Sequence, residues 1–204
     1  PEEGDSFARA IVAPHLPGGQ QEIAIRMPLG DGQFPKAGIY DAAAAAIADH
    51  AAAGRDVVVL CEGDPFFYGS FMYLHERLAG RYAVEIVPGV SSVMASAAAI
   101  ARPLAARNDV LSVIPGPLED ERIRAQIAAC EAVAIIKLGR HFARIRALIA
   151  ELGLTHSAVY VERVSLENQK LMPLADATGE APYFSMILIY KGAEDWVTSL
   201  PPGG

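Results

Sequence analysis

Short apolar runs alternate with segments of helical periodicity along most of the chain, and this alternation is typical of an α/β protein. An Ala-rich helix is predicted over 40–53. The run at 56–61 that follows is apolar on both faces and therefore predicts a central strand. A second helix is predicted over 70–78, where apolar residues recur at helical spacing. The first part of the chain thus predicts a largely parallel sheet covered by helices.

The middle of the chain continues this alternation and then interrupts it. A predicted strand ends at Pro88 and Gly89, and Ser91 or Ser92 is placed to cap the helix that follows. A further strand leads into the sequence Pro-Gly-Pro at 115–117, and the acidic residues after this break suit a helix N-terminus. We therefore expect a linker between two domains at 115–117.

The last third of the chain differs, because three strand-like runs follow one another with no helical segment between them. Strands connected in this way pair as antiparallel neighbours. The sequence predicts an N-terminal α/β domain over 1–114 and a C-terminal α/β domain over 118–204, with a ligand cleft between them. The three strand-like runs lie at 158–164, 169–174 and 183–190.

Composition and charge exclude two classes of partner. The chain has 204 residues, of which 52% are hydrophobic, and it carries a formal net charge of -7 without any run of basic residues. Nucleic-acid binding is not expected, because it requires a surface that neutralises phosphates. The apolar stretches are shorter than the roughly 20 residues that cross a bilayer, so membrane insertion is not expected either.

Cysteine and histidine usage indicates a reducing compartment and argues against a metal. Cys61 and Cys130 each lie in an apolar segment, which predicts free thiols in a cytoplasmic protein. The five histidines show no metal-ligand spacing, and neither cysteine has a partner at C-x-x-C distance. We therefore expect no metal site.

Two glycine-containing loops follow predicted strands, at the position where open α/β sheets bind ligands. The loop EGDPFFYG at 62–69 places Glu62 and Asp64 on either side of Gly63, and the loop PGVSS at 88–92 offers hydroxyl and N–H groups. Acids disfavour a phosphate, and the chain has neither a G-x-G-x-x-G nor a P-loop motif. A cationic ligand such as the sulfonium of S-adenosylmethionine fits better than a dinucleotide or a triphosphate.

Each of these features also has an ordinary structural interpretation. Asp64 precedes a proline and can be a turn former alone. The aromatic residues at 66–73 suit either the core or a flat apolar ligand, and Phe71 is expected in the core. Arg140 and Arg144 lie one predicted helical turn apart, where they can be surface residues or can face substrate carboxylates.

Taken in order, several motifs resemble the tetrapyrrole (corrin-pathway) methyltransferases, a family that binds S-adenosylmethionine between two α/β domains. The Gly-Asp-Pro and Pro-Gly-Val-Ser motifs mark the broad family. The longer run after Gly-Asp-Pro is similar to members that methylate carbon 20 of precorrin-2. The resemblance extends from about Ser6 to Tyr190. It is carried by EGDPFFYGSFMYLHERL, VPGVSSVMA, PLAARNDVLSVIPGPL, IIKLGRHF, YVERVSLENQ and PYFSMILI.

The resemblance also implies an element that this sequence does not contain. Family members begin with a strand and a Gly-x-Gly-Pro-Gly-Asp-Pro loop beside the cofactor and substrate cleft, and no such loop occurs from Pro1 onward. We therefore expect the N-terminal domain to lack this glycine-rich loop and one strand of its sheet.

The family's contacts with S-adenosyl-L-methionine can be carried over to matching positions of this chain. Some lie in the two loops of the N-terminal domain, and the others follow strands of the C-terminal domain. Leu138 is expected to close an apolar wall on the adenine ring, with Val164 and Ser185 at backbone positions beside it. The implied cofactor-binding residues are Glu62, Gly63, Asp64, Phe67, Ser91, Ser92, Leu138, Val164 and Ser185.

The implied reaction transfers a methyl group to carbon 20 of precorrin-2 and gives precorrin-3A in cobalamin biosynthesis. That carbon is electron-rich, so it can attack the methyl directly, and placement of the two reactants should dominate catalysis. A proton must leave afterwards. Asp64, Tyr68 and Glu162 are the candidate catalytic groups, without a ranking among them. Glu162 can instead form a local ion pair with Arg163.

The carboxylates of the tetrapyrrole are expected to bind Arg107, Arg140 and Arg144, and the resemblance implies a homodimer. Two alternatives stay open. The substrate could be the cobalt-containing intermediate of the anaerobic route, or another carbon could be methylated, because motifs for the cofactor do not separate these reactions. The chain could also be a non-catalytic tetrapyrrole-binding protein.

Overall fold

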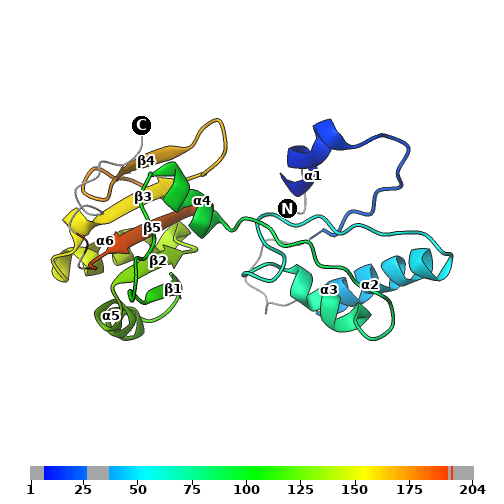
Figure 1. Cartoon of the computed structure of the whole chain (residues 1–204), viewed down its shortest axis with the longest axis horizontal. Helices are drawn as coiled ribbons and strands as arrows, with labels where there is room; N and C mark the ends of the chain where they lie inside the picture. The colour runs from blue at the N-terminus through cyan, green and yellow to red at the C-terminus, as the bar shows by residue number, and fades with distance from the viewer. Residues whose placement is uncertain (1–6, 27–36, 193, 195–204) are drawn as a thin grey trace. The chain divides into compact units, whose positions relative to one another are not determined.

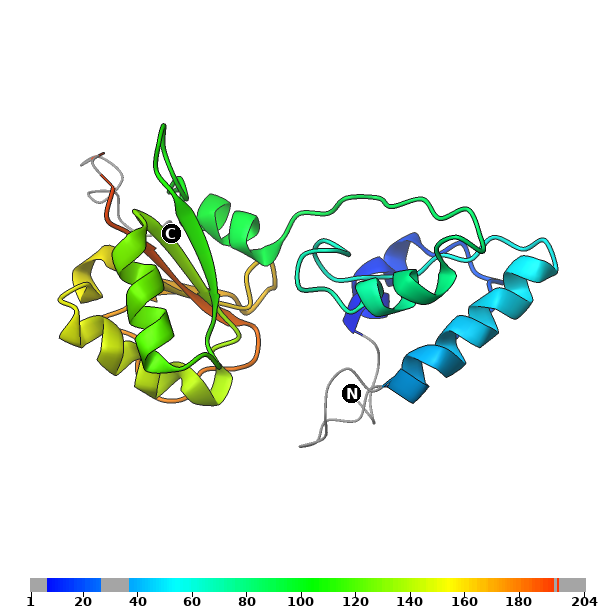
Figure 2. The same ribbon diagram turned by 90° about the horizontal axis from the view of Figure 1, so that it is seen from below.

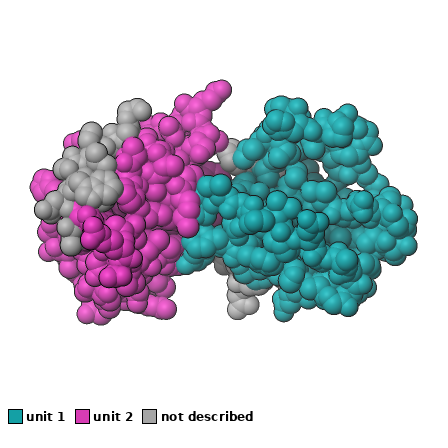
Figure 3. Space-filling view, in the orientation of Figure 1, with its two compact units in different colours: residues 1–91 teal, residues 92–204 magenta. Residues whose placement is uncertain are grey.

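The computed structural model describes residues 7–26, 37–192 and 194, and it divides into two compact units (Figures 1 and 3). The N-terminal unit spans residues 1–91 and the C-terminal unit spans residues 92–204. Each unit is built around hydrophobic clusters of its own.

The C-terminal unit is built on a five-stranded mixed sheet with the strand order β1-β2-β5-β3-β4, and its strands are labelled in Figure 1. Figure 2 shows this sheet with helices on both of its sides. Its strands are β1 (Leu111–Pro115), β2 (Ala132–Ile136), β3 (Ala158–Glu162), β4 (Lys170–Pro173) and β5 (Ser185–Tyr190). β1 and β2 pair in parallel, whereas β5 is antiparallel to β2 and β3, and β4 is antiparallel to β3. The strands β1, β2 and β3 therefore end at the same edge of the sheet, which we call the carboxyl edge.

Helices cover both faces of this sheet, because its central strands are apolar on both faces. α5 (Asp120–Ala129) and α6 (Phe142–Glu151) bury apolar stripes on one face, together with alternate strand residues such as Ile135. α4 (Ser92–Ala99) lies on the other face, against intervening residues such as Ile136. Two short 3-10 helices precede α6 and β3. They are η2 (Gly139–His141) and η3 (Thr155–Ser157).

The N-terminal unit is held together by two helices and the extended segments beside them. Its helices are α1 (Phe7–Val12), the 3-10 helix η1 (Ala13–His15), α2 (Ala37–Ala52) and α3 (Phe71–Leu78). α2 and α3 pack against each other through buried residues that include Ile47 and Leu74. Residues of the extended segments 57–61 and 82–86 join the same cluster.

The two segments predicted as strands at 56–61 and 83–87 are extended, but neither forms a ladder with another strand in the part of the chain that the structure describes. Val57 and Val59 contact the cluster between α2 and α3, whereas Val58 between them is 81% exposed. Only one face of this segment is packed, although its sequence predicts burial of both. A strand becomes central only when neighbours pair with it on both sides.

The other predicted elements agree with the structure except in two respects. The three consecutive runs near the C-terminus are antiparallel neighbours, as expected. The sheet is mixed, however, because only the pair β1 and β2 is parallel among its four strand pairings. The expected linker at 115–117 differs from the observed division at Ser91 and Ser92. β1 belongs to the C-terminal sheet, and Gly116 continues its pairing by donating a hydrogen bond from its N–H to the Ile136 carbonyl at 2.7 Å.

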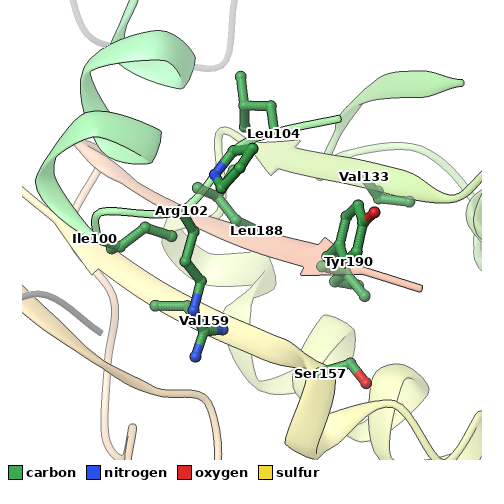
Figure 4. A pocket seen from close by; sticks show the side chains of 10 residues that line it. Ile100, Arg102, Leu104, Val133, Ser157, Val159, Leu188 and Tyr190 are labelled. Carbon is green, nitrogen blue, oxygen red and sulfur yellow. The ribbon is translucent and has the colours of Figure 1, made fainter. Parts of the chain in front are cut away.

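A small, partly open hollow lies in the C-terminal unit between the loop after α4 and the strands β3 and β5 (Figure 4). Arg102 extends across its apolar walls. The Nε atom of Arg102 is buried without a hydrogen-bond partner among the described residues, and burial lowers the pKa of the guanidinium. None of the site residues expected from the sequence lines this hollow, so it is not the candidate site.

Candidate functional site

Two loops of the N-terminal unit meet backbone to backbone. One is the loop 62–69 and the other is the loop 88–91. Gly63 has a φ of +69°, in the left-handed region that favours glycine. A Cβ atom on Gly89 would overlap the carbonyl oxygen of Gly63. The two glycines therefore allow a contact between these loops that side chains would prevent.

Asp64 joins the same two loops through its carboxylate. Its Oδ1 accepts a hydrogen bond from the Phe66 N–H at 2.9 Å, and its Oδ2 accepts one from the Gly89 N–H at 3.0 Å. These N–H groups, that of Gly89 first, lower the pKa of the Asp64 carboxyl. Asp64 is thus more than a local turn former, because one of its bonds reaches a loop 25 residues further along the chain.

Glu62 and Ser91 lie on either side of this contact. The Glu62 side chain stays largely exposed, yet desolvation by the surrounding protein raises the pKa of its carboxyl, against the opposing hydrogen bond from the Ala8 backbone. Ser91 is 7% exposed, and its Cα lies 3.7 Å from the position that a Cβ on Gly63 would take. Ser92, the next residue, is exposed at the first position of α4.

The aromatic residues after Asp64 divide into a packed group and an exposed group. Phe71 is buried in the cluster between α2 and α3, as expected from its helical spacing. Phe66, Phe67 and Tyr68 are exposed, and Tyr68 has a φ of +56°. A non-glycine residue in this region is strained, and such strain is found more often at ligand-binding positions than elsewhere. The exposed group is the part that can contact a ligand.

Three of the positions expected to contact the cofactor lie at the carboxyl edge of the C-terminal sheet. Leu138 follows β2, Val164 follows β3, and Ser185 is the first residue of β5. The backbone here is strained at residues that are not glycine. The positive φ values are +59° at Lys137, +51° at Arg163 and +67° at Ser165. The expected cofactor contacts therefore lie beside residues whose backbone the surrounding fold holds in an unfavourable conformation.

The side chains of these three residues are engaged within the C-terminal unit. Leu138 is fully buried in the cluster formed with α5 and α6, so its side chain belongs to the core. The Ser185 hydroxyl donates a hydrogen bond to the Pro182 carbonyl at 2.6 Å. Val164 packs against the cluster beneath α4. Contacts with a ligand at these positions are therefore left mainly to the backbone.

Glu162 is 4% exposed and lies at the end of β3. It accepts a hydrogen bond from the Tyr160 hydroxyl at 2.9 Å and pairs with Arg163 and, at 3.2 Å, with Lys170. The ion pair with Arg163 expected from the sequence is present, and Tyr160 and Lys170 add to it. Burial, followed by the hydrogen bond to Glu162, raises the pKa of Tyr160.

The three arginines expected to bind substrate differ in their surroundings. Arg144 on α6 forms an ion pair with Asp120 and donates hydrogen bonds to the carbonyls of Gly116 and Leu118, at 2.6 and 3.1 Å. Arg107 pairs with Glu194 at 2.9 Å. Arg140 lies in η2, before α6 begins, and is exposed. The two arginines predicted on one helix are therefore in different elements.

Within 7–26, 37–192 and 194, no group of histidine, cysteine, aspartate and glutamate side chains is arranged to hold a metal ion. In the same part of the chain, no helix is long and apolar enough to cross a membrane.

Comparison with known proteins identifies the family. The profile of the Tetrapyrrole (Corrin/Porphyrin) Methylases matches residues 4–178, which is most of the chain. The chain belongs to this family. A solved tetrapyrrole methylase fold also resembles it, a uroporphyrin-III C-methyl transferase from Thermus thermophilus complexed with S-adenyl homocysteine. That structure has a TM-score of 0.57 and 23% identity, and the match covers 76% of this chain and 73% of the other.

Two relatives have more similar sequences. The chain is 46% identical over 151 residues to a precorrin-2 C(20)-methyltransferase from a Sinorhizobium species. That match covers 74% of this chain but only 62% of the relative. It is also 30% identical over 192 residues to the cobalt-precorrin-2 C(20)-methyltransferase of Salmonella typhimurium, covering 92% of this chain and 81% of that protein. The chain thus spans less than two thirds of the Sinorhizobium relative.

Sequence reasoning did not identify the hydrogen bond between Asp64 and Gly89 in this tetrapyrrole methylase. The glycine and the acid were each noticed, but nothing in the sequence pairs residues 25 positions apart. It also did not identify Tyr160 and Lys170 as partners of Glu162. The strand period places Tyr160 and Glu162 on one face of β3, so that part could have been found.

Proposed function

We propose that this protein transfers the methyl group of S-adenosyl-L-methionine to carbon 20 of precorrin-2, giving precorrin-3A in cobalamin biosynthesis. The observation that carries the proposal is the 46% identity with a precorrin-2 C(20)-methyltransferase across three quarters of the chain. The solved family member, at 23% identity, supports only the fold. We further propose that the protein is cytoplasmic and acts as a homodimer, as the resemblance implies.

The residues of the two N-terminal loops fit a methyl donor that carries a sulfonium. Gly63 and Gly89 let the two loops approach each other closely, and Glu62 and Asp64 bring carboxylates to this position. When bound, S-adenosyl-L-methionine would supply an electrophilic methyl group. We propose that backbone at Gly63 and Ser91, with the side chains of Glu62 and Phe67, holds its amino-acid part. The family resemblance implies further cofactor contacts at Leu138, Val164 and Ser185.

The exposed aromatic group is the proposed platform for the flat tetrapyrrole. Phe67 and Tyr68 present ring faces or edges, and their rings contact each other with centroids 5.1 Å apart. Arg140 is the arginine best placed to bind a substrate carboxylate, since Arg144 is held by three acceptors and Arg107 by an acid. We propose that Arg140 contributes most to substrate binding among the three.

Tyr68 is the proposed relay of the proton released from the substrate, since its hydroxyl oxygen can accept that proton while it passes its own proton to solvent. The two carboxylate oxygens of Asp64 already accept backbone hydrogen bonds, and Glu162 is buried against three partners. Tyr68 is 45% exposed in the loop beside the glycine contact. Its hydroxyl can therefore reach a bound ligand without breaking the hydrogen bonds that hold Asp64 or Glu162.

A second candidate substrate is favoured by the Salmonella relative, whose name specifies cobalt-precorrin-2. Incubation of the protein with precorrin-2 and with its cobalt complex, in separate reactions with methyl-labelled S-adenosylmethionine, distinguishes the two. We expect label to enter metal-free precorrin-2 at carbon 20. Labelling of the cobalt complex alone would favour the second candidate. Binding of the tetrapyrrole without methyl transfer in either reaction would favour a carrier.

A further inference from the structure

We infer that Asp64 is a positioning residue, whose carboxylate holds the loop 88–91 in place for the methyl donor without taking part in proton transfer. This inference rests on the proposed function, because it assigns a role within the proposed cofactor site. It differs from the sequence-based expectation, in which Asp64 is also a candidate catalytic group.

The two oxygens of Asp64 have separate tasks. Oδ1 fixes the turn of its own loop through the Phe66 N–H, and Oδ2 holds the second loop through the Gly89 N–H. A carboxylate held in this way already uses its strongest acceptor sites for hydrogen bonds from main-chain N–H groups. The Phe66 and Gly89 N–H groups also stabilise the ionised form of the side chain, which makes Asp64 a weak base.

Gly89 combines a hydrogen bond to a charged side chain with a close backbone contact. Its N–H is the donor to Asp64, and the space that a side chain would need is taken by the Gly63 carbonyl. The hydrogen bond therefore draws together two loops that are already in close contact. Ser91 follows two residues later with its Cα near Gly63, so the same bond sets the position of the serine backbone.

Three variants separate positioning from catalysis. Asp64→Ala removes both acceptor atoms, and Asp64→Asn keeps one acceptor oxygen but removes the charge. Gly89→Ala disturbs the contact from the other side. Gly38→Ala is the matched control, because a Cβ at Gly38 meets no other atom within 4 Å and Gly38 lies in the same unit. S-adenosylhomocysteine serves as the probe, with affinity measured by calorimetry and turnover measured separately.

We expect Asp64→Ala and Gly89→Ala each to weaken S-adenosylhomocysteine binding about tenfold, because the first removes the acceptor of the Gly89 N–H and the second forces the two loops apart. Asp64→Asn should restore part of this affinity, with kcat reduced by less than about tenfold. Loss of a general base would instead lower kcat by about 10² to 10⁴. A fall of that size in Asp64→Asn, with affinity unchanged, would overturn the inference. Unchanged affinity in Asp64→Ala would do so as well.

The Gly89 amide proton gives a readout that does not depend on the proposed function. A donor to a carboxylate resonates downfield, so its NMR signal should move upfield in Asp64→Ala, while the Gly38 amide should not move. Failure of the unaltered protein to bind S-adenosylhomocysteine would count against the proposed function. An unchanged chemical shift of the Gly89 amide proton in Asp64→Ala would instead count against the hydrogen bond itself.

Discussion

The C-terminal and N-terminal units contain strand-like segments of similar hydrophobicity, but they bury them to different extents. β2 and β5 are buried along their whole lengths, between helices on both faces and strands on both sides. In the N-terminal unit, residues such as Val58 and Val87 are 81% and 73% exposed beside neighbours that are packed. Apolar composition therefore shows that a segment can be buried. Whether it is buried depends on partners supplied by the rest of the fold.

Shortening one apolar side chain in each unit tests this difference in burial. Ile145→Ala opens a cavity in the core of the C-terminal unit, because Ile145 is fully buried, and should lower the free energy of unfolding by about 2 to 5 kcal/mol. Val58→Ala should change it by less than about 0.5 kcal/mol, because the side chain is exposed. Chemical denaturation followed by circular dichroism measures both. A large loss from Val58→Ala would show that this face is covered in solution.

Arg144 and Arg140 differ in a similar way, because Arg144 is held by acceptors of the fold and Arg140 is exposed. Arg144→Ala leaves Asp120 and two main-chain carbonyls without their donor, and should lower the free energy of unfolding by about 1 to 3 kcal/mol. Arg140→Ala should leave stability nearly unchanged but weaken tetrapyrrole binding. Arg122→Ala, at an exposed position on α5, is the control for loss of a positive charge. Equal losses of substrate affinity in Arg140→Ala and Arg144→Ala would contradict this division of roles.

A smaller effect is expected from pH, and it concerns the C-terminal unit. The folded state raises the pKa of Tyr160 by burial and by the hydrogen bond to Glu162. The corresponding stability is fully present below about pH 10, the usual pKa of tyrosine, and is lost as the pH rises above it. Tyr160→Phe should cost about 1 kcal/mol at neutral pH and should reduce the loss at alkaline pH.

Urea unfolding between pH 8 and pH 11 measures this dependence. Tyr183→Phe is the control, because Tyr183 is exposed and the variant should follow the unaltered protein. If Tyr160→Phe lost stability as steeply as the unaltered protein above pH 10, another group would have to account for the dependence.

Local patterns were enough to predict most elements of the fold. The apolar stripe of α6 and the position of Phe71 follow from helical spacing, and the antiparallel strands follow from the short connections between them. The domain boundary could not be found in this way. The sequence Pro-Gly-Pro at 115–117 has the composition of a linker, but its first residue, Pro115, pairs with Ile136 of β2 and is the last residue of an edge strand.

The candidate site was predictable in its loops and less so in its side chains. Glycine and acid next to predicted strands marked the loops 62–69 and 88–91, which do touch. The role of Arg144 could not be predicted, because two of its acceptors are carbonyls 26 and 28 residues away in sequence. Every residue has a main-chain carbonyl, so no sequence motif identifies these two acceptors. Leu138 stays a predicted cofactor contact, and the structure buries its side chain in the core, which the run IIKL does not reveal.

Gly89 has a consequence for how this gene can vary. Any missense change at its codon adds a side chain where the Gly63 carbonyl already lies, so we expect no neutral substitution at this position. Gly80 offers a contrast, because it has a φ of +84° but open space around it. Asparagine can occupy such a backbone conformation at low cost. Among functional variants, substitutions should therefore accumulate at Gly80 and be absent at Gly89.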